Sequence, residues 1–167
     1  VEWFASRRGV DVAADLRFAS FDLQDQWRQY VDVLGYDFRR WDVHAADAAD
    51  AILDAYPDGP IVCMLSNILC YCSDDQTADL FLRLLEDRVT AIIANERGAV
   101  QRICDLLEDR GVVVVHLLDQ TLAGRDDRQL VFLPPGTDAD RPGIPLPDDF
   151  RPVFPNQPYE EKKRASA

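Results

Sequence analysis

Continuous apolar runs alternate with segments of helical periodicity through the middle of this 167-residue chain. The runs predict strands near residues 60–66, 89–95, 112–118 and 129–133. Between them, apolar residues at helical spacing predict a helix near residues 74–87 and another that starts near Ala99 and stops at Gly111. Strands without polar alternation are typical of a parallel sheet covered by helices on both faces, so the pattern predicts a mainly parallel α/β fold.

The predicted strands also define a core. One residue of each run is expected to be almost fully buried: Leu65, Ile92, Val114 and Phe132. The last connection differs from the others, because only about ten residues separate Leu118 from Gln129, too few for a helical crossover. We therefore expect the last two strands to form an antiparallel hairpin that closes the sheet.

Two shorter strands are expected nearer the N-terminus, near residues 16–22 and 36–42. Each ends at an aspartate, Asp22 and Asp42. A helix-period segment separates them, and Asp22 can cap the helix that it predicts. A short helix then precedes the turn at residues 57–60, and Ser73 has the spacing of a capping box ahead of the helix at residues 74–87.

Beyond Pro134 the sequence becomes rich in proline and aspartate and loses its periodicity. Such a segment has too little apolar surface for a core of its own. The sequence thus predicts one α/β domain over residues 1–134 and an extended tail over residues 135–167. Only residues 1–15 precede the first predicted strand, and we expect the domain to be incomplete at its N-terminus.

Charge narrows the range of partners. Eighteen basic and thirty acidic residues give a net charge of −12, which repels nucleic acids and anionic membranes. No apolar run approaches the about 18–20 residues of a membrane span. These features predict a cytoplasmic protein with neither nucleic acid nor a membrane as partner.

The four cysteines do not form a metal-binding pattern. Cys70 and Cys72 lack a second Cys or His pair at suitable spacing, so no metal is expected. Cys63 and Cys104 are interpreted as small core residues, and all four thiols as reduced.

Polar residues at the predicted strand ends are the candidates for chemistry, since ligands of open parallel sheets bind outside the carboxyl ends of the strands. They are Asp22, Asp42, the pair Ser66 and Asn67, the pair Asn95 and Glu96, and Asp119. Helix capping and turn hydrogen bonds are alternative explanations for the same residues. Glu96, beside Arg97, is interpreted as half of a local ion pair on the surface.

Several familiar signatures are absent from the sequence. None of the eight glycines forms Gly-x-Gly, and neither Gly-Lys-Ser/Thr nor Gly-x-Ser-x-Gly occurs. The dinucleotide fingerprint, the phosphate-binding loop and the hydrolase nucleophile elbow are thereby missing. Their absence disfavours an unrelated α/β nucleotide enzyme.

From residue 16 to residue 134, the order of elements resembles the class I S-adenosylmethionine-dependent methyltransferases. The resemblance rests on Phe21-Asp22-Leu23 and Trp41-Asp42-Val43 after the first two strands, on the segment IVCMLSNILCY at residues 61–71, and on the closing hairpin. It implies a methyltransferase-like variant of the Rossmann fold, with S-adenosylmethionine as cofactor.

The resemblance also implies roles for individual residues. Asp22 would bind the ribose and Asp42 would lie near the adenine. The residues assigned to cofactor binding are Asp22, Leu23, Asp42 and Val43, and those assigned to the methyl-transfer pocket are Ser66, Asn67 and Tyr71.

The glycine-rich loop that follows the family's first strand has no counterpart here. Two functions therefore stay open. One is methyl transfer to an unidentified small molecule or protein acceptor. The other is a non-catalytic, methyltransferase-like domain that binds or scaffolds an unidentified protein partner, which the missing loop and the long tail favour.

Overall fold

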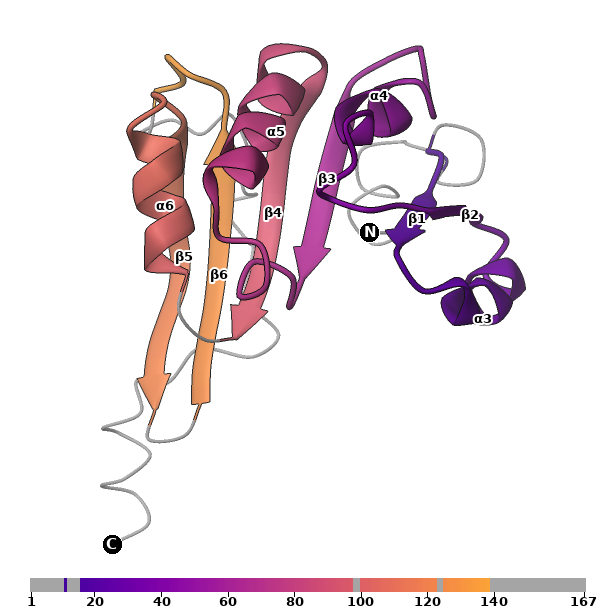
Figure 1. The fold of residues 1–167 in the computed structure, drawn as a ribbon, viewed down its shortest axis with the longest axis horizontal. Helices are drawn as coiled ribbons and strands as arrows, with labels where there is room; N and C mark the ends of the chain where they lie inside the picture. Colours follow the sequence, from indigo (N-terminus) through magenta and orange to yellow (C-terminus); the bar gives the residue numbers. More distant parts are fainter. Residues whose placement is uncertain (1–10, 12–15, 98–99, 123–124, 139–167) are drawn as a thin grey trace, which may run out of the picture. The chain divides into compact units, whose positions relative to one another are not determined.

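The computed structural model describes residue 11 and residues 16–97, 100–122 and 125–138. The predicted tail at residues 135–167 thus lies outside the described residues, apart from its first four positions. The chain divides into two compact units, Val1–Ala48 and Ala49–Ala167, and each is described by itself. Figure 1 labels the helices and strands.

The first unit contains a two-stranded parallel sheet. Strands β1 (Ala19–Asp22) and β2 (Asp37–Arg40) pair with Asp22 opposite Arg40 at their carboxyl ends. The 3-10 turn η1 (Asp25–Trp27) and helix α3 (Arg28–Val33) connect them. Both predicted strands and the intervening helix are confirmed.

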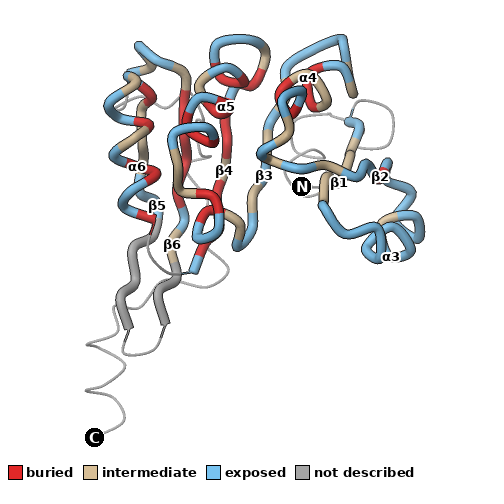
Figure 2. Tube along the Cα trace, viewed as in Figure 1, coloured by how far each residue is buried: buried red, intermediate tan, exposed pale blue. Residues whose placement is uncertain are grey.

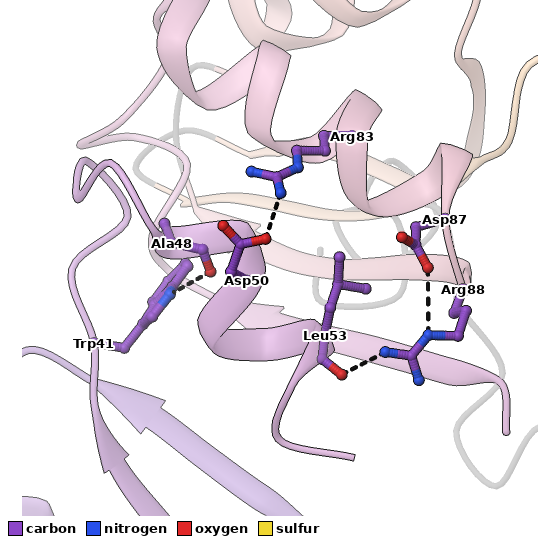
Figure 3. A network of polar contacts seen from close by, with 7 residues as sticks. All are labelled: Trp41, Ala48, Asp50, Leu53, Arg83, Asp87 and Arg88. Carbon is purple, nitrogen blue, oxygen red and sulfur yellow. Dashed lines mark hydrogen bonds and ion pairs between the residues drawn. The ribbon is translucent and has the colours of Figure 1, made fainter. Parts of the chain in front are cut away.

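Aromatic contacts hold this small unit together. The rings of Phe21 and Trp41 meet edge to face, with centroids 6.2 Å apart. The Arg28 guanidinium lies 4.7 Å from the centroid of the buried Phe38 ring. Trp41 also donates its indole N–H to the carbonyl of Ala48, at 3.0 Å (Figure 3).

The second unit holds the larger sheet. Its strands lie in the order β3-β4-β6-β5. The elements in chain order are α4 (Ala48–Leu53, which starts at the unit boundary), β3 (Ile61–Ser66), α5 (Asp75–Glu86), β4 (Val89–Arg97), α6 (Gln101–Glu108), β5 (Val113–Leu122) and β6 (Arg125–Leu133).

This sheet is mixed. Strands β3 and β4 are parallel, whereas β6 is antiparallel to both β4 and β5. The predicted closing hairpin is therefore confirmed, but its strands are longer than expected. Pairing continues to Leu122 opposite Arg125, so residues 123–124 alone separate β5 from β6. Two of the four strand pairs in the described residues are parallel, so the expected mainly parallel sheet is not established.

Helices α5 and α6 pack beside each other on one face of the larger sheet (Figure 1). Helices on both faces, as predicted, are not seen among the described helices of this unit. The opposite face carries a second apolar cluster, in which Ala91, Val131 and Leu133 are buried.

The main core lies between these helices and the sheet, where buried residues concentrate in Figure 2. Ile92 and Phe132 are opposite each other in register, and both are fully buried as predicted. The predictions for Leu65 and Val114 are wrong, because both are only half-buried. The reason is their position, since β3 and β5 are the outer strands of the described sheet and have one strand neighbour each.

Arginine side chains attach α4 to the rest of the second unit (Figure 3). Arg88 donates to the carbonyl oxygens of Leu53 and, at 2.7 Å, of Tyr56. Arg83, on α5, forms an ion pair with Asp50 of α4. Since Arg88 satisfies carbonyls at the end of α4, it replaces a helix cap there.

Candidate functional site

The carboxyl ends of β1 and β2 bring Asp22 and Asp42 to the same edge of the small sheet. Asp22 is the last residue of β1, and Asp42 follows the end of β2 by two positions. Each carboxylate accepts one backbone N–H two residues ahead through Oδ1: Gln24 at 2.8 Å for Asp22, and His44 at 3.0 Å for Asp42. Asp22 does not cap the following helix as predicted, because Gln24 is the cap residue and forms no side-chain cap bond.

The turn bonds leave acceptor capacity on both carboxylates. An ionised carboxylate offers two oxygens with about four lone-pair positions, and each turn bond uses one of them. Asp22 is half-buried and Asp42 is exposed, so a ligand can reach both. Leu23 is 53% exposed and Val43 is half-buried at the same two strand ends. These two acceptor carboxylates fit a ligand that donates hydrogen bonds from hydroxyl and amino groups.

Ser66 and Asn67 form the turn that follows β3. The Asn67 N–H donates to the carbonyl of Asn95 at 3.0 Å, which extends the β3–β4 pairing by one residue. Asn67 has a φ of 54°, in the left-handed region that favours glycine. Its side-chain Nδ2 donates to Ser66 Oγ at 3.3 Å, and both side chains remain exposed. Turn bonding and exposure to a ligand are thus compatible at this pair.

Tyr71 belongs to the same connection between β3 and α5. Its N–H donates to the carbonyl of Ile68 at 2.9 Å, and its side chain is 83% exposed. The predicted capping residue for α5 is off by one position. Asp74 caps the helix by accepting the Thr77 N–H at 2.8 Å, whereas Ser73 Oγ donates to the carbonyl of Leu69 at 2.6 Å.

Glu96 was expected at a strand end, but its burial was not predicted from the sequence. It was interpreted as part of a surface ion pair, but its side chain is 1% exposed. Its Oε1 accepts the N–H of Ile68 at 3.0 Å, and its Oε2 accepts the N–H of Leu69 at 3.1 Å. Burial raises the pKa of Glu96, and the N–H donors offset part of that rise.

The alternation of side chains along β4 would have predicted that Glu96 is buried. Side chains two apart in a strand share a face, so Ile92, Ala94 and Glu96 all lie on the inner face of β4. A carboxylate that follows two core residues on one face is expected to be buried. Burial of a carboxylate then requires donors, which the turn after β3 supplies.

All four cysteines are free thiols. Cys104 is buried as expected, whereas Cys63 is only half-buried. Burial raises the pKa of Cys63, Cys72 and Cys104 to about 11. Cys72 lies within the turn region, where its Sγ donates to the carbonyl of Ile68 at 3.1 Å.

The remaining features of the described part of the chain concern metal ions, membranes and cavities. No group of three or more His, Cys, Asp or Glu side chains there is arranged to hold a metal ion. No described helix has the length and apolar character needed to cross a membrane. A surface cavity of about 410 Å³ lies at the amino ends of β3 and β4, bounded by residues that include Pro60, Val89 and Pro134, and no predicted site residue lines it.

The predicted site residues fall into two groups, one in each compact unit: Asp22, Leu23, Asp42 and Val43 in the first, and Ser66, Asn67 and Tyr71 in the second. The chain matches no protein-family model, and a search of curated proteins finds no significant match. Function must therefore be argued from the geometry of each group.

Proposed function

We propose that this protein binds S-adenosylmethionine and transfers its methyl group to a small molecule or a protein acceptor. The observation that carries the proposal is the parallel register of β1 and β2, which puts two carboxylates, Asp22 and Asp42, at one sheet edge. Two further features support it. Ser66 and Asn67 directly follow another strand, and the sheet of the second unit ends in an antiparallel hairpin. The finer fold assignment, a methyltransferase-like Rossmann variant, is part of the same proposal.

The roles of the side chains follow from their hydrogen-bonding capacity. Asp22 accepts the ribose hydroxyls, and Asp42 accepts the adenine amino group. Ser66, Asn67 and Tyr71 are exposed after β3 and line the site of methyl transfer. The cofactor supplies a methyl group already activated by its sulfonium, so the main task of the residues is to orient the acceptor.

Calorimetric titration with S-adenosylmethionine and S-adenosylhomocysteine tests the proposal. Asp22→Asn removes the charge but keeps the shape of the side chain. Hydrogen bonds to a charged acceptor contribute about 1.5–3 kcal/mol, so we expect binding to weaken roughly tenfold or more. Asp32→Asn is the matched control, because Asp32 is an exposed carboxylate on α3 of the same unit. Absence of heat with the unmodified protein, or equal binding by the Asp22 variant, would count against the proposal.

The second candidate is a non-catalytic domain that binds a protein partner. The observation that favours it is the exposed apolar surface of β3, where Val62 is 55% and Met64 is 78% exposed. An outer strand without charged residues is suited to pair with an added strand. Failure to bind S-adenosylmethionine, together with specific binding of a protein lost on Met64→Glu, would favour this candidate.

A further inference from the structure

Glu96 is the one buried charged residue among those that the structure describes. It lies near the carboxyl end of β4, and its strand neighbours on the same face, Ile92 and Ala94, are fully buried. A carboxylate in such a position is costly unless donors compensate for the lost water. The carboxylate of Glu96 therefore needs hydrogen-bond donors from the protein at this position.

The donors are two successive backbone N–H groups of the turn after β3. Ile68 donates to Oε1 at 3.0 Å and Leu69 to Oε2 at 3.1 Å. Leu69 is fully buried, so water cannot replace the carboxylate as its acceptor. Successive backbone N–H groups that point at one anion form a concave anion-binding site. The carboxylate thereby determines the conformation of this turn.

Asn67 is the residue that this arrangement constrains. Its own N–H is bound to the carbonyl of Asn95, and the next two N–H groups are bound to Glu96. Two adjacent residues of β4 thus hold the backbone on both sides of Asn67. Between them Asn67 adopts a φ of 54°, a left-handed conformation that asparagine adopts more readily than most residues with a side chain.

We propose that Glu96 is the positioning residue of the Ser66–Asn67 turn. By holding Ile68 and Leu69, it fixes the left-handed conformation of Asn67 and hence the direction in which the exposed side chains of Ser66 and Asn67 meet a ligand. The identity of that ligand as S-adenosylmethionine rests on the proposed function, whereas the positioning of the turn does not. Glu96 itself contacts no ligand in this scheme.

If Glu96 only stabilised the fold, its replacement would affect ligand binding no more than a substitution that weakens the core does. If Glu96 positions the turn, its replacement should weaken binding specifically. Glu96→Gln keeps the size of the side chain but presents an NH₂ group to one of the two N–H donors. Two variants serve as controls. Glu86→Gln removes an exposed carboxylate at the end of α5, and Ile92→Val weakens the packing of the same strand without touching the turn.

The test combines calorimetric titration of S-adenosylhomocysteine with amide ¹H–¹⁵N spectra of each variant. We expect Glu96→Gln to shift the amides of residues 66–69 and to weaken binding by about tenfold. Glu86→Gln and Ile92→Val should bind as the unmodified protein does. Equal binding by Glu96→Gln, or equal losses in Glu96→Gln and Ile92→Val, would overturn the proposal.

If the unmodified protein does not bind the probe, the proposed function fails while the positioning proposal is still decided by the spectra. Shifts confined to residues 66–69 in Glu96→Gln support it, and unchanged shifts at Ser66 and Asn67 overturn it. If Glu96→Gln does not fold, an acid titration of the unmodified protein decides.

In that titration the amides of Ile68 and Leu69 should shift together as one carboxyl is protonated. Cys72, whose pKa burial raises to about 11, interacts electrostatically with both Glu96 and Asp74. Arg128 is opposite Glu96 in the β4–β6 register. The Thr77 amide, which binds Asp74, reports that carboxylate separately. Ile68 and Leu69 amides that follow Thr77, or that do not titrate, would overturn the proposal.

Discussion

The Oε1 atom of Glu96 lies 3.0 Å from the backbone nitrogen of Ile68, although 28 positions separate the two residues in the sequence. This bond joins a strand in the middle of the larger sheet to the connection after its neighbour. This bond is part-buried, and a second, buried bond joins Glu96 to the N–H of Leu69, so the two bonds tie the turn to the core.

Truncation of Ile92 tests the position of β4 in the core. Ile92 is fully buried between the sheet and its helices. Ile92→Ala should lower the free energy of unfolding by about 2–5 kcal/mol, as other large-to-small core substitutions do. Denaturant unfolding measures the change. Met64→Ala is the control, because that side chain is 78% exposed and should cost no more than about 0.5 kcal/mol.

The dependence of stability on pH tests the burial of Glu96. Burial raises its pKa in the folded chain above 4.5, the value of an unperturbed glutamic acid. Between 4.5 and the raised pKa, the folded state binds more protons than the unfolded state. The contribution of Glu96 to stability should therefore increase as the pH falls through the folded pKa, and level off below the unfolded one.

Comparison with Glu96→Gln isolates that contribution, since the other titrating groups are common to both proteins. The difference in unfolding free energy between the unmodified protein and the variant should shift in favour of the unmodified protein as the pH falls. Urea unfolding at a series of pH values measures it. A difference that is constant with pH, or that moves the other way, would show that burial does not raise this pKa.

Much of the fold was predictable because it depends on local pattern. Runs of apolar residues predicted the six strands seen among the described residues, and the short connection after Leu118 predicted the antiparallel hairpin. The burial of Leu65 was not predictable in the same way. An apolar run looks alike in a central and in an outer strand, and strand order is set by contacts distant in sequence.

In the candidate site, the positions of the two aspartates were predictable, because each follows a strand that the apolar pattern predicts. Asp22 and Asp42 were expected at strand ends, and the register of β1 and β2 brings those ends to one edge. The burial of Glu96 was not predicted, because its partners are backbone N–H groups, which almost every residue carries and no sequence motif marks. Its neighbour Arg97 suggested an ion pair, a local interpretation that ignored strand alternation.

Thiol chemistry gives a further prediction. With a pKa of about 11, Cys63, Cys72 and Cys104 would each be ionised in roughly one molecule per thousand near pH 8, and the thiolate is the reactive form. Cys70 is exposed. Alkylation followed by mass spectrometry should therefore label Cys70 first in the folded protein, and all four cysteines in denaturant. Early labelling of Cys72 would contradict the burial of the turn region.

Substitutions at Asn67 separate backbone conformation from side-chain bonding. Asn67 has a φ of 54°, and its Nδ2 bonds to Ser66 Oγ. Alanine and glycine both remove that side-chain bond, but only glycine adopts a positive φ without steric cost. Since the left-handed conformation costs a residue with a Cβ about 1–2 kcal/mol, Asn67→Ala should be less stable than Asn67→Gly by roughly 1 kcal/mol. Denaturant unfolding of the two variants measures the difference. Equal stabilities would mean that the turn relaxes to a negative φ, and that Glu96 does not hold Asn67 in the left-handed conformation.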